Sequence, residues 1–297
     1  MTPPSMVLRL LQAIPRAKAS GALYWLLTWG RGRLEGGEFL ASVQAEKRGN
    51  VALVTLNRPR VLNAFDREVI HALTRLAEEF GRDPGVRAVV VTGAGGNFSS
   101  GADIAELRGL GGVLEARELT REAHRMMGAI ERCPKPFIAA VTGNAVGGGQ
   151  ELCLACDLRV AGEGATFGQV EVNIGSIPSW GGTQRLARTV GVAYAKDLVY
   201  TGRLVGAREA FEKGLVSRLV PDDQVLEEAF SLARRIAEQA PLAIEASKAS
   251  LSRAFDNDLA ANLAHDVDLF SALYASEDLQ EGLRAFLEKR APEYRGR

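Results

Sequence analysis

Three consecutive glycines and a glutamate stand immediately before an apolar run that favours a helix. The segment, residues 143–157, reads GNAVGGGQELCLACD and contains Gly147, Gly148, Gly149 and Glu151. Glycine lets a ligand approach the peptide N–H groups closely. If a helix begins here, its first N–H groups have no partner within the helix and attract negative charge. The spacing therefore predicts an anion-stabilising backbone site beside a carboxylate able to act as an acid or base.

Two nucleotide-binding motifs are excluded because residues that they require are missing. A phosphate-binding loop G-x-x-x-x-G-K-[ST] would place Lys and Ser/Thr where Gly149 and Gln150 stand. The glycine turn at residues 93–96 lacks the third glycine of a dinucleotide-binding motif, because Phe98 occupies that position. We therefore expect neither a phosphate-binding loop nor a Rossmann site.

The few cysteines and histidines argue against a metal or redox centre. Cys153 and Cys156 form a C-x-x-C, but no second pair follows and both fall in an apolar helical run, so we interpret them as core residues. The three histidines show no metal-ligand spacing. With Cys133, the cysteines form no disulfide framework, which fits a reducing compartment such as the cytoplasm.

Composition is that of an ordinary globular chain. The 297 residues are 46% hydrophobic, which suffices for a sizeable core. Lys plus Arg and Asp plus Glu both number 36, so the formal net charge is zero and there is no global electrostatic argument for nucleic acid or a membrane surface.

The first 40 residues differ from the rest. Up to Arg33 there are five basic residues and no acidic one, and the apolar patch at residues 22–29 is too short for a membrane span. A secretory signal, a transit peptide to the mitochondrial matrix and an upstream extension compete. We favour a poorly ordered extension over residues 1–40, followed by an α/β core over 41–222 and a helical region over 223–297.

Strand and helix patterns alternate through the core. Short apolar runs at residues 51–56, 88–92 and 137–141 predict buried strands. Between them, apolar residues recur at helical spacing after Asp66 and again from Leu119 to Ile130. This order indicates an α/β fold whose third strand runs directly into the glycine-rich segment.

Several motifs together resemble one family. The segments SSGADI, GNAVGGGQEL, ACDLRVA, FGQVEVNIGSIP, GGTQRL and FLEKRAPEY occur in the order found in the enoyl-CoA hydratase/isomerase, or crotonase, family. The resemblance runs from Val51 to the C-terminus. It implies a crotonase-like spiral of strand-strand-helix repeats with a C-terminal helical trimerisation region, and hence a homotrimer or homohexamer.

The resemblance also implies a catalytic set. Backbone N–H groups of Ala102 and Gly148 are expected to form an oxyanion hole for a thioester carbonyl. Hydratases of the family carry two glutamates, which match Glu151 and Glu171 here. We hypothesise that Glu171 handles the proton reaching C2 and that Glu151 holds and activates water. An enoyl-CoA hydratase of acyl-CoA or fatty-acid metabolism is thus expected, with coenzyme A as part of the substrate and no metal or bound cofactor.

Substrate contacts follow the same resemblance. The turn before the first helix and the backbone around the oxyanion hole resemble the groove for the CoA chain, and two C-terminal residues match positions that reach a neighbouring subunit's CoA. Trp180 departs from the small residue common in hydratases, so we expect no preference for long straight acyl chains. The full predicted substrate-binding set is Arg60, Val61, Leu62, Ala102, Asp103, Ile104, Gly148, Trp180, Phe286 and Lys289.

Two other functions are weighed. Isomerases, decarboxylases and thioester hydrolases of the family keep the oxyanion hole but change the acid/base set, and the glutamate pair disfavours them. Some relatives bind RNA through a lysine-rich helix, but residues 66–87 mix acidic and basic side chains here. We therefore expect an acyl-CoA thioester as the partner, and neither nucleic acid nor membrane.

Overall fold

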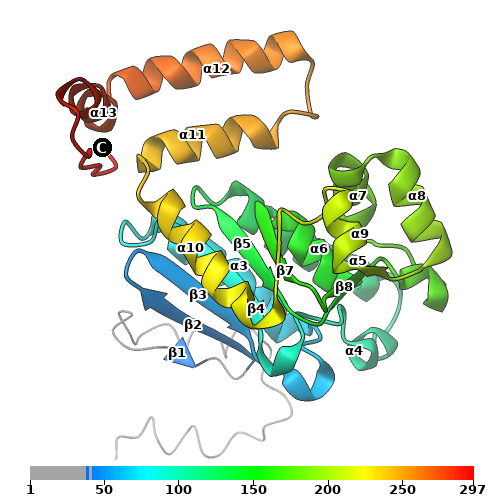
Figure 1. Cartoon of the computed structure of the whole chain (residues 1–297). Coiled ribbons are helices and arrows are strands. Elements are labelled where there is room, and N and C mark those ends of the chain that lie inside the picture. The colour runs from blue at the N-terminus through cyan, green and yellow to red at the C-terminus, as the bar shows by residue number, and fades with distance from the viewer. Residues whose placement is uncertain (1–37, 40–41) are drawn as a thin grey trace, which may run out of the picture. The chain divides into compact units, whose positions relative to one another are not determined.

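Two β-sheets form the framework of the molecule. The computed structural model describes residues 38–39 and 42–297, and its larger sheet has the strand order β1-β2-β3-β4-β5-β7-β10 (Figure 1). The first three strands pair antiparallel and the others parallel. Its strands are β1 (Glu38–Phe39), β2 (Val43–Arg48), β3 (Val51–Leu56), β4 (Ala88–Gly93), β5 (Phe137–Val141), β7 (Leu158–Gly162) and β10 (Arg218–Val220). The smaller sheet has the order β6-β8-β9, with β6 (Asn144–Val146), β8 (Thr166–Gly168) and β9 (Val205–Gly206).

The larger sheet is buried on both faces. Successive strand residues point to opposite faces, so Val89 and Val91 of β4 pack into one apolar cluster while Ala88 and Val90 pack into another. The first cluster includes residues of α3 (Arg67–Arg82), α5 (Val113–Arg132) and α6 (Gly148–Ala155); the second includes residues of α10 (Val225–Ala237). The expected α/β class is confirmed.

Local sequence explains where the main helix of the first layer begins. Asp66 precedes α3 in an extended conformation and its carboxylate accepts a hydrogen bond from the Val69 N–H at 3.0 Å. This is the N-cap predicted from the sequence. Shorter helices then surround the glycine-rich segment: α4 (Ile104–Arg108), α7 (Gly182–Val190), α8 (Val192–Thr201), α9 (Ala207–Glu212), and the 3₁₀ helices η1 (Pro59–Val61), η2 (Ala94–Gly96), η3 (Glu171–Ile174) and η4 (Asp222–Gln224).

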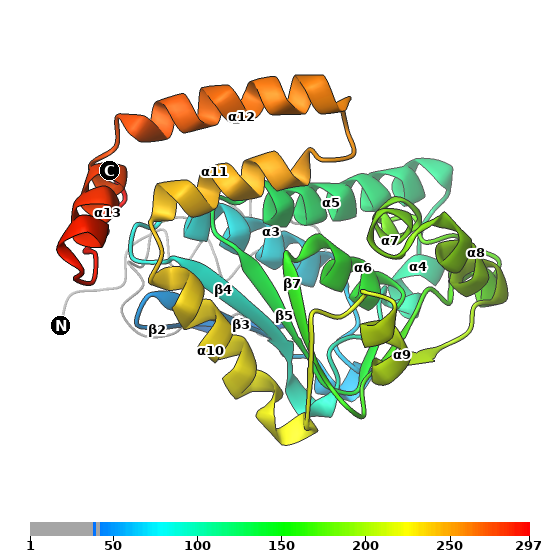
Figure 2. The same ribbon diagram turned by 45° about the horizontal axis from the view of Figure 1, so that its top comes forward.

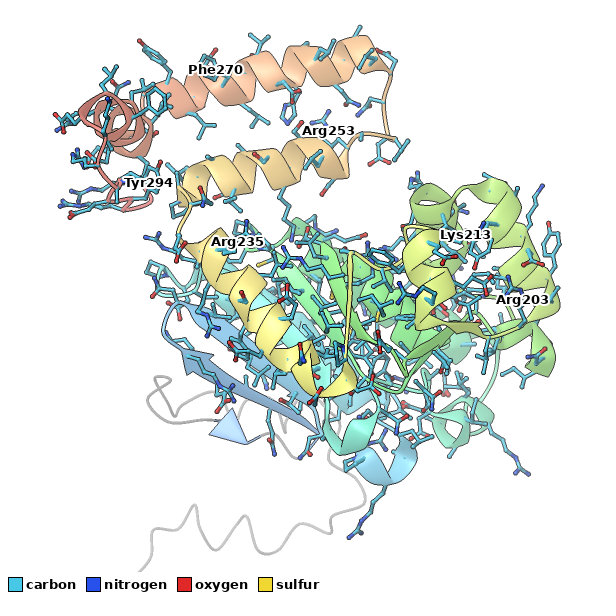
Figure 3. The ribbon with its side chains drawn as sticks, viewed as in Figure 1. Arg203, Lys213, Arg235, Arg253, Phe270 and Tyr294 are labelled. Atoms are coloured by element: carbon cyan, nitrogen blue, oxygen red, sulfur yellow. The ribbon has the colours of Figure 1, made fainter. Side chains whose placement is uncertain are left out.

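Three helices follow α10 at the C-terminal end: α11 (Pro241–Ser252), α12 (Leu259–Tyr274) and α13 (Glu277–Glu288), which lead away from the sheet in both views (Figures 1 and 2). The ammonium group of Lys248 on α11 donates to Asp157 at 2.7 Å and to the Ile130 carbonyl at 3.1 Å, which fixes α11 to the core. Arg87, before β4, donates to the carbonyl of Tyr294, labelled in Figure 3, at 2.9 Å. These contacts tie the helical C-terminal region back to the core.

The expectation of a poorly ordered extension falls outside the described residues, except for Glu38 and Phe39, which pair with β2. Among the residues that are described, none of the helices has both the length and the apolar character that crossing a membrane requires.

Candidate active site

Two backbone N–H groups from distant parts of the chain meet at the start of α6. A Cβ atom added to Gly101 would lie 2.7 Å from the nitrogen of Gly148, and one added to Gly148 would lie 3.3 Å from the nitrogen of Ala102. Within residues 38–39 and 42–297, neither the Ala102 nor the Gly148 N–H donates to a protein acceptor. Two preorganised donors are thus available to an oxygen that gains negative charge.

The local backbone explains why these two donors are free. Phe65 donates to the Gly101 carbonyl at 2.8 Å and accepts from the Asp103 N–H at 2.9 Å, so the intervening Ala102 N–H faces the other way. Gly148 is the first residue of α6, where a helix has no internal acceptor for its N–H. Gly101 has φ +92°, a left-handed conformation that favours glycine at this close approach.

Glu151 lies on the first turn of α6 with only 2% of its surface exposed. Its Oε1 accepts a hydrogen bond from the Gly182 N–H at 2.7 Å. The pKa of this carboxyl is raised to about 8: burial is the largest cause and the negative charge of Glu171 adds to it, while the backbone N–H groups of Gly182 and Trp180 oppose the shift. At neutral pH this carboxyl therefore carries its proton most of the time.

Glu171, the first residue of η3, approaches the same backbone from the other side. A Cβ atom on Gly147 would lie 3.3 Å from Glu171 Oε1, and Glu171 Oε2 is buried without a protein hydrogen-bond partner in the described part of the chain. Burial raises the pKa of Glu171 as well. Both carboxyls thus lie near the turn that carries the Gly148 N–H, and at least one of their oxygens is left for a substrate or a water.

Trp180 forms a wall beside the two donors. It is 4% exposed and stacks on Phe65, with ring centroids 6.2 Å apart and planes 14° apart. A Cβ atom on Gly148 would come within 2.8 Å of Trp180 Cζ3. The indole therefore packs in the core next to Gly148, and its expected effect on the acyl chain stays a prediction.

Comparison with known proteins now identifies the family. The family model described as "Enoyl-CoA hydratase/isomerase" matches residues 46–297. A probable enoyl-CoA hydratase of Mycobacterium bovis is 40% identical over 85% of this chain and 97% of its own length, and a short-chain-enoyl-CoA hydratase of Clostridium acetobutylicum is 38% identical over 84% and 96%. The crystal structure of an enoyl-CoA hydratase from Bacillus anthracis superposes with a TM-score of 0.83 at 37% identity, covering 86% of this chain and all of that one. The chain belongs to the enoyl-CoA hydratase/isomerase family.

The residues that family resemblance assigns to the CoA groove lie together. Ser100 N–H donates to the Leu62 carbonyl at 2.9 Å, which places the turn at residues 60–62 beside the 102–104 backbone. The side chains of Val61, Leu62 and Ile104 are 44%, 45% and 59% exposed, as a surface groove requires.

The side chain of Asp103 in this groove has structural partners of its own. It accepts from the Ala105 N–H at 3.0 Å, which caps α4, and it pairs with Arg58 at 3.0 Å. The contact of Asp103 with a substrate stays a prediction.

Within one chain, Phe286 and Lys289 lie far from this site. Phe286 is 83% exposed near the end of α13, and Lys289 is the exposed residue that ends this helix. In both ribbon views α13 lies at the opposite end from α4 and α6 (Figures 1 and 2). Their contact with CoA stays a prediction that needs a second copy of the chain.

In the loop that contacts Glu151, sequence reasoning singled out Trp180 but gave no role to Gly182 or to the nearby Arg185. Gly182 supplies the N–H to the carboxylate of Glu151, and Arg185 supports the same loop through the Trp180 carbonyl at 3.0 Å. Both residues belong to the segment GGTQRL, which carried the family resemblance but was given no role. The described residues contain no group of three or more His, Cys, Asp or Glu side chains able to hold a metal ion.

Proposed function

We propose that this protein is an enoyl-CoA hydratase, which adds water across the 2,3 double bond of a 2-enoyl-CoA thioester. One observation carries the proposal: the buried carboxyl of Glu151 and the half-buried carboxyl of Glu171 both lie near the glycine turn, where the free N–H groups of Gly148 and Ala102 meet. An isomerase or a hydrolase of the same family needs the N–H pair but not both carboxyls in this place. The two relatives compared above carry hydratase names, and the match covers nearly the whole length of each.

In the proposed reaction the thioester oxygen accepts from the Ala102 and Gly148 N–H groups. Addition of water at C3 moves negative charge onto this oxygen, and donors that are already oriented stabilise it without reorganisation. Removing one donor of this kind typically raises the barrier by about 2.7 to 4 kcal/mol. Addition of water neither oxidises nor reduces the substrate, so the proposed reaction needs no further cofactor.

The carboxyl pair supplies the proton transfers. One group must take a proton from water as it attacks C3, and the other must deliver a proton to C2. Two nearby carboxyls in a buried site share one proton near neutral pH, which makes one a base and the other an acid. Glu151 holds its proton more tightly in this structure, so the division of labour expected from the family, with Glu171 serving C2, stays a prediction about the substrate-bound state.

The test is steady-state hydration of crotonyl-CoA, followed by loss of the conjugated thioester absorbance. Wild type is expected to turn over, and Glu151→Gln and Glu171→Gln are each expected to lose at least about 10²-fold in kcat, the scale of a positioned acid or base. Glu163→Gln is a matched control, because this glutamate is exposed and, among the described residues, its side chain pairs with Arg208 alone, at 3.9 Å. If wild type binds the thioester but never hydrates it, an isomerase or hydrolase activity replaces the proposal.

A preference for short acyl chains belongs to the same proposal. Trp180 fills space beside the oxyanion hole, where an acyl chain leaves the thioester. Two similar proteins are named for short substrates: the short-chain hydratase of Clostridium acetobutylicum and a crotonyl-CoA hydratase of Syntrophomonas wolfei, which is 39% identical over 82% of this chain and 94% of its own length.

We also propose a homotrimer or homohexamer working in the cytoplasm. Large apolar side chains are exposed along the C-terminal helices, a pattern typical of association surfaces. They are Leu251, Phe255, Leu259, Leu263, Val267, Phe270, Tyr274, Leu283, Phe286 and Leu287. The cysteines, which are free and buried, fit a reducing compartment.

A further inference from the structure

The loop at residues 179–182 has two sides, and its front side faces the carboxyl pair. Its Gly182 N–H donates to Glu151 Oε1 at 2.7 Å, and the ring of its Trp180 packs against Gly148. This loop therefore orients a proposed acid/base group and a wall of the proposed oxyanion hole at the same time.

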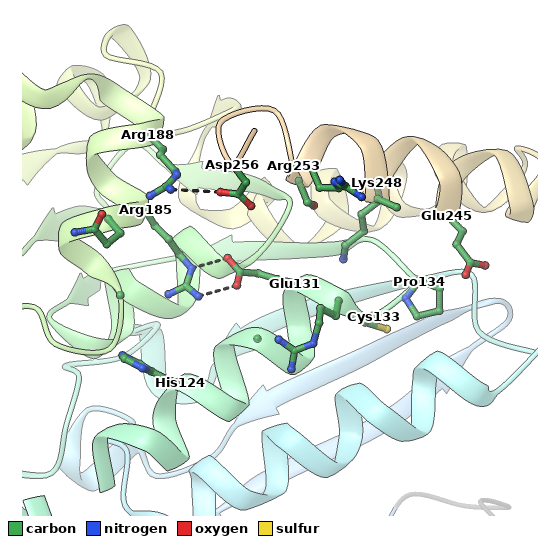
Figure 4. A pocket seen from close by; sticks show the side chains of 16 residues that line it. His124, Glu131, Cys133, Pro134, Arg185, Arg188, Glu245, Lys248, Arg253 and Asp256 are labelled. Atoms are coloured by element: carbon green, nitrogen blue, oxygen red, sulfur yellow. Dashed lines mark hydrogen bonds and ion pairs between the residues drawn. The ribbon is translucent and has the colours of Figure 1, made fainter. Parts of the chain in front are cut away.

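The back of this loop rests on an ion pair. Arg185 donates through Nη1 to the Trp180 carbonyl at 3.0 Å, while its Nε and Nη2 donate to the two carboxylate oxygens of Glu131 at 2.5 and 2.7 Å (Figure 4). Glu131 lies near the end of α5, and Arg185 lies in α7. A third contact joins His124 Nε2 to the Ser179 carbonyl at 2.7 Å.

The guanidinium fits the loop because residue 181 is glycine. A Cβ atom there would lie 1.9 Å from Arg185 Nη1, and Gly181 has φ +111°. The guanidinium is planar and always charged, so its three hydrogen bonds fix the carbonyl of Trp180 in both distance and direction. Arg185 and Glu131 lie on the wall of a cavity of about 770 Å³ behind the loop. Neither Glu151 nor Glu171 lines this cavity.

We propose that Arg185, oriented by Glu131, is a positioning residue that holds the 180–182 backbone so that its N–H groups keep Glu151 aligned. The inference rests on the acid/base role proposed for Glu151. A displacement of about 1 Å at a reacting group can cost about 10²-fold in rate. Arg185 can therefore have a measurable effect on the reaction rate without contacting the substrate.

Steady-state kinetics with crotonyl-CoA tests this role. Arg185→Gln is expected to lower kcat about tenfold or more with little change in KM, because alignment matters most in the transition state. Arg185→Lys keeps the charge and is expected to recover part of the loss. Arg188→Gln is the matched control: this arginine lines the same cavity from the same helix, but its only ion pair is to Asp256, at 3.4 Å, within the described residues.

A double-mutant cycle separates positioning from general destabilisation. If Arg185 acts through Glu151, then Arg185→Gln costs little further activity in a Glu151→Gln background, whereas independent losses multiply. Glu131→Gln, which leaves the Trp180 carbonyl contact in place, is expected to lose less than Arg185→Gln. Multiplying losses, or an Arg185→Gln variant as active as wild type, would overturn the inference.

A readout without turnover keeps this inference distinct from the proposed hydratase reaction. The charged groups that act on Glu151 are Glu171, which raises its pKa, and Arg185, which lowers it. In Arg185→Gln the upper pH at which the Tm gap between wild-type Glu151 and its Gln variant stops widening is therefore expected to rise, whereas the onset of the gap, set by the unfolded chain, stays fixed. If wild type fails to hydrate crotonyl-CoA but this shift is seen, the hydratase proposal is wrong and the positioning role stands. An unchanged upper pH contradicts the positioning role.

Discussion

At Glu151, burial outweighs three interactions that favour the charged carboxylate. The N–H groups of Gly182 and Trp180 and the guanidinium of Arg185 all lower its pKa, yet the pKa is raised to about 8. Loss of water around a carboxylate is therefore the dominant effect at this site. A side chain that is ordinary in sequence becomes an acid that titrates near neutral pH.

This shift predicts a pH-dependent stability difference. Glu151 keeps its proton up to about pH 8 in the folded chain, but in the unfolded chain its pKa is the ordinary 4.5. Its stabilising contribution is thus full below pH 4.5 and is lost as the pH rises to about 8. Glu151→Gln cannot titrate, so its Tm is expected to exceed that of wild type increasingly from pH 5 to pH 8.5. Thermal melts across this range measure the gap; a gap independent of pH contradicts the raised pKa.

Trp180 leads to a second prediction, about acyl-chain selection. Trp180→Ala removes the indole beside Gly148, so the ratio of kcat/KM for 2-decenoyl-CoA to that for crotonyl-CoA is expected to rise at least about tenfold, which corresponds to about 1.4 kcal/mol in an apolar pocket. The new cavity also lowers the Tm. Leu198→Ala, which creates a cavity in α8, controls for lost stability and is expected to leave the ratio unchanged. An unaltered ratio in Trp180→Ala assigns the indole to packing alone.

Among the secondary-structure elements, α6 has the most direct connection to chemistry. Its first residue presents a free N–H, its first turn carries Glu151, and all eight of its residues are buried. An apolar helix with so little exposed surface is held rigidly by its neighbours. The donor and the carboxyl are therefore kept in a constant relation by one short element.

Gly148→Ala tests how closely this element meets its neighbours. The added Cβ would lie 2.8 Å from Trp180 Cζ3 and 3.3 Å from the Ala102 nitrogen, so one of them must move. We expect hydration of crotonyl-CoA to fall by about 10²-fold, the cost of one oxyanion-hole donor. Gly206→Ala is the control, because nothing lies within 4 Å of its Cβ position and its φ is an ordinary −74°. Near-normal activity in Gly148→Ala contradicts the assigned geometry.

On the scale of the whole molecule, the C-terminal helices leave apolar surface without a partner in the same chain. None of the side chains of α12 is buried, although the helix is predominantly apolar. Exposed apolar side chains along one helix are typical of a surface that a second copy covers. A single chain therefore presents an incomplete interface, consistent with the proposed oligomer.

Phe270→Asp is expected to weaken this assembly. Phe270, labelled in Figure 3, is 61% exposed on α12, and a charge there would have to be buried without a partner. Light scattering after size exclusion is expected to show a trimer or hexamer for wild type and a smaller species for the variant. Val192→Asp adds a charge at a similarly exposed residue of α8 and is expected to leave the mass unchanged. A monomeric wild type would contradict the proposed oligomer.

Strands and helices with strong local patterns were predictable from the sequence. The strands at residues 51–56 and 137–141 have the predicted bounds, and Asp66 caps its helix, because buried runs and caps depend on neighbouring residues. The strand β2 was not predicted: it ends in exposed charged residues and lacks a continuous apolar run.

The sequence by itself determined the kinds of groups at the candidate site. Spacing alone indicated the glycine-rich helix start beside Glu151, and the family resemblance of the ordered motifs implied Glu171 and the N–H groups of Ala102 and Gly148. Only the tertiary structure decided which groups face each other and what surrounds them. The Gly182 to Glu151 bond spans 31 residues and the Arg185 to Glu131 pair spans 54. Such contacts, and the burial that raises the pKa of Glu151, depend on how whole elements pack, because solvent exclusion belongs to the assembled core and not to any segment.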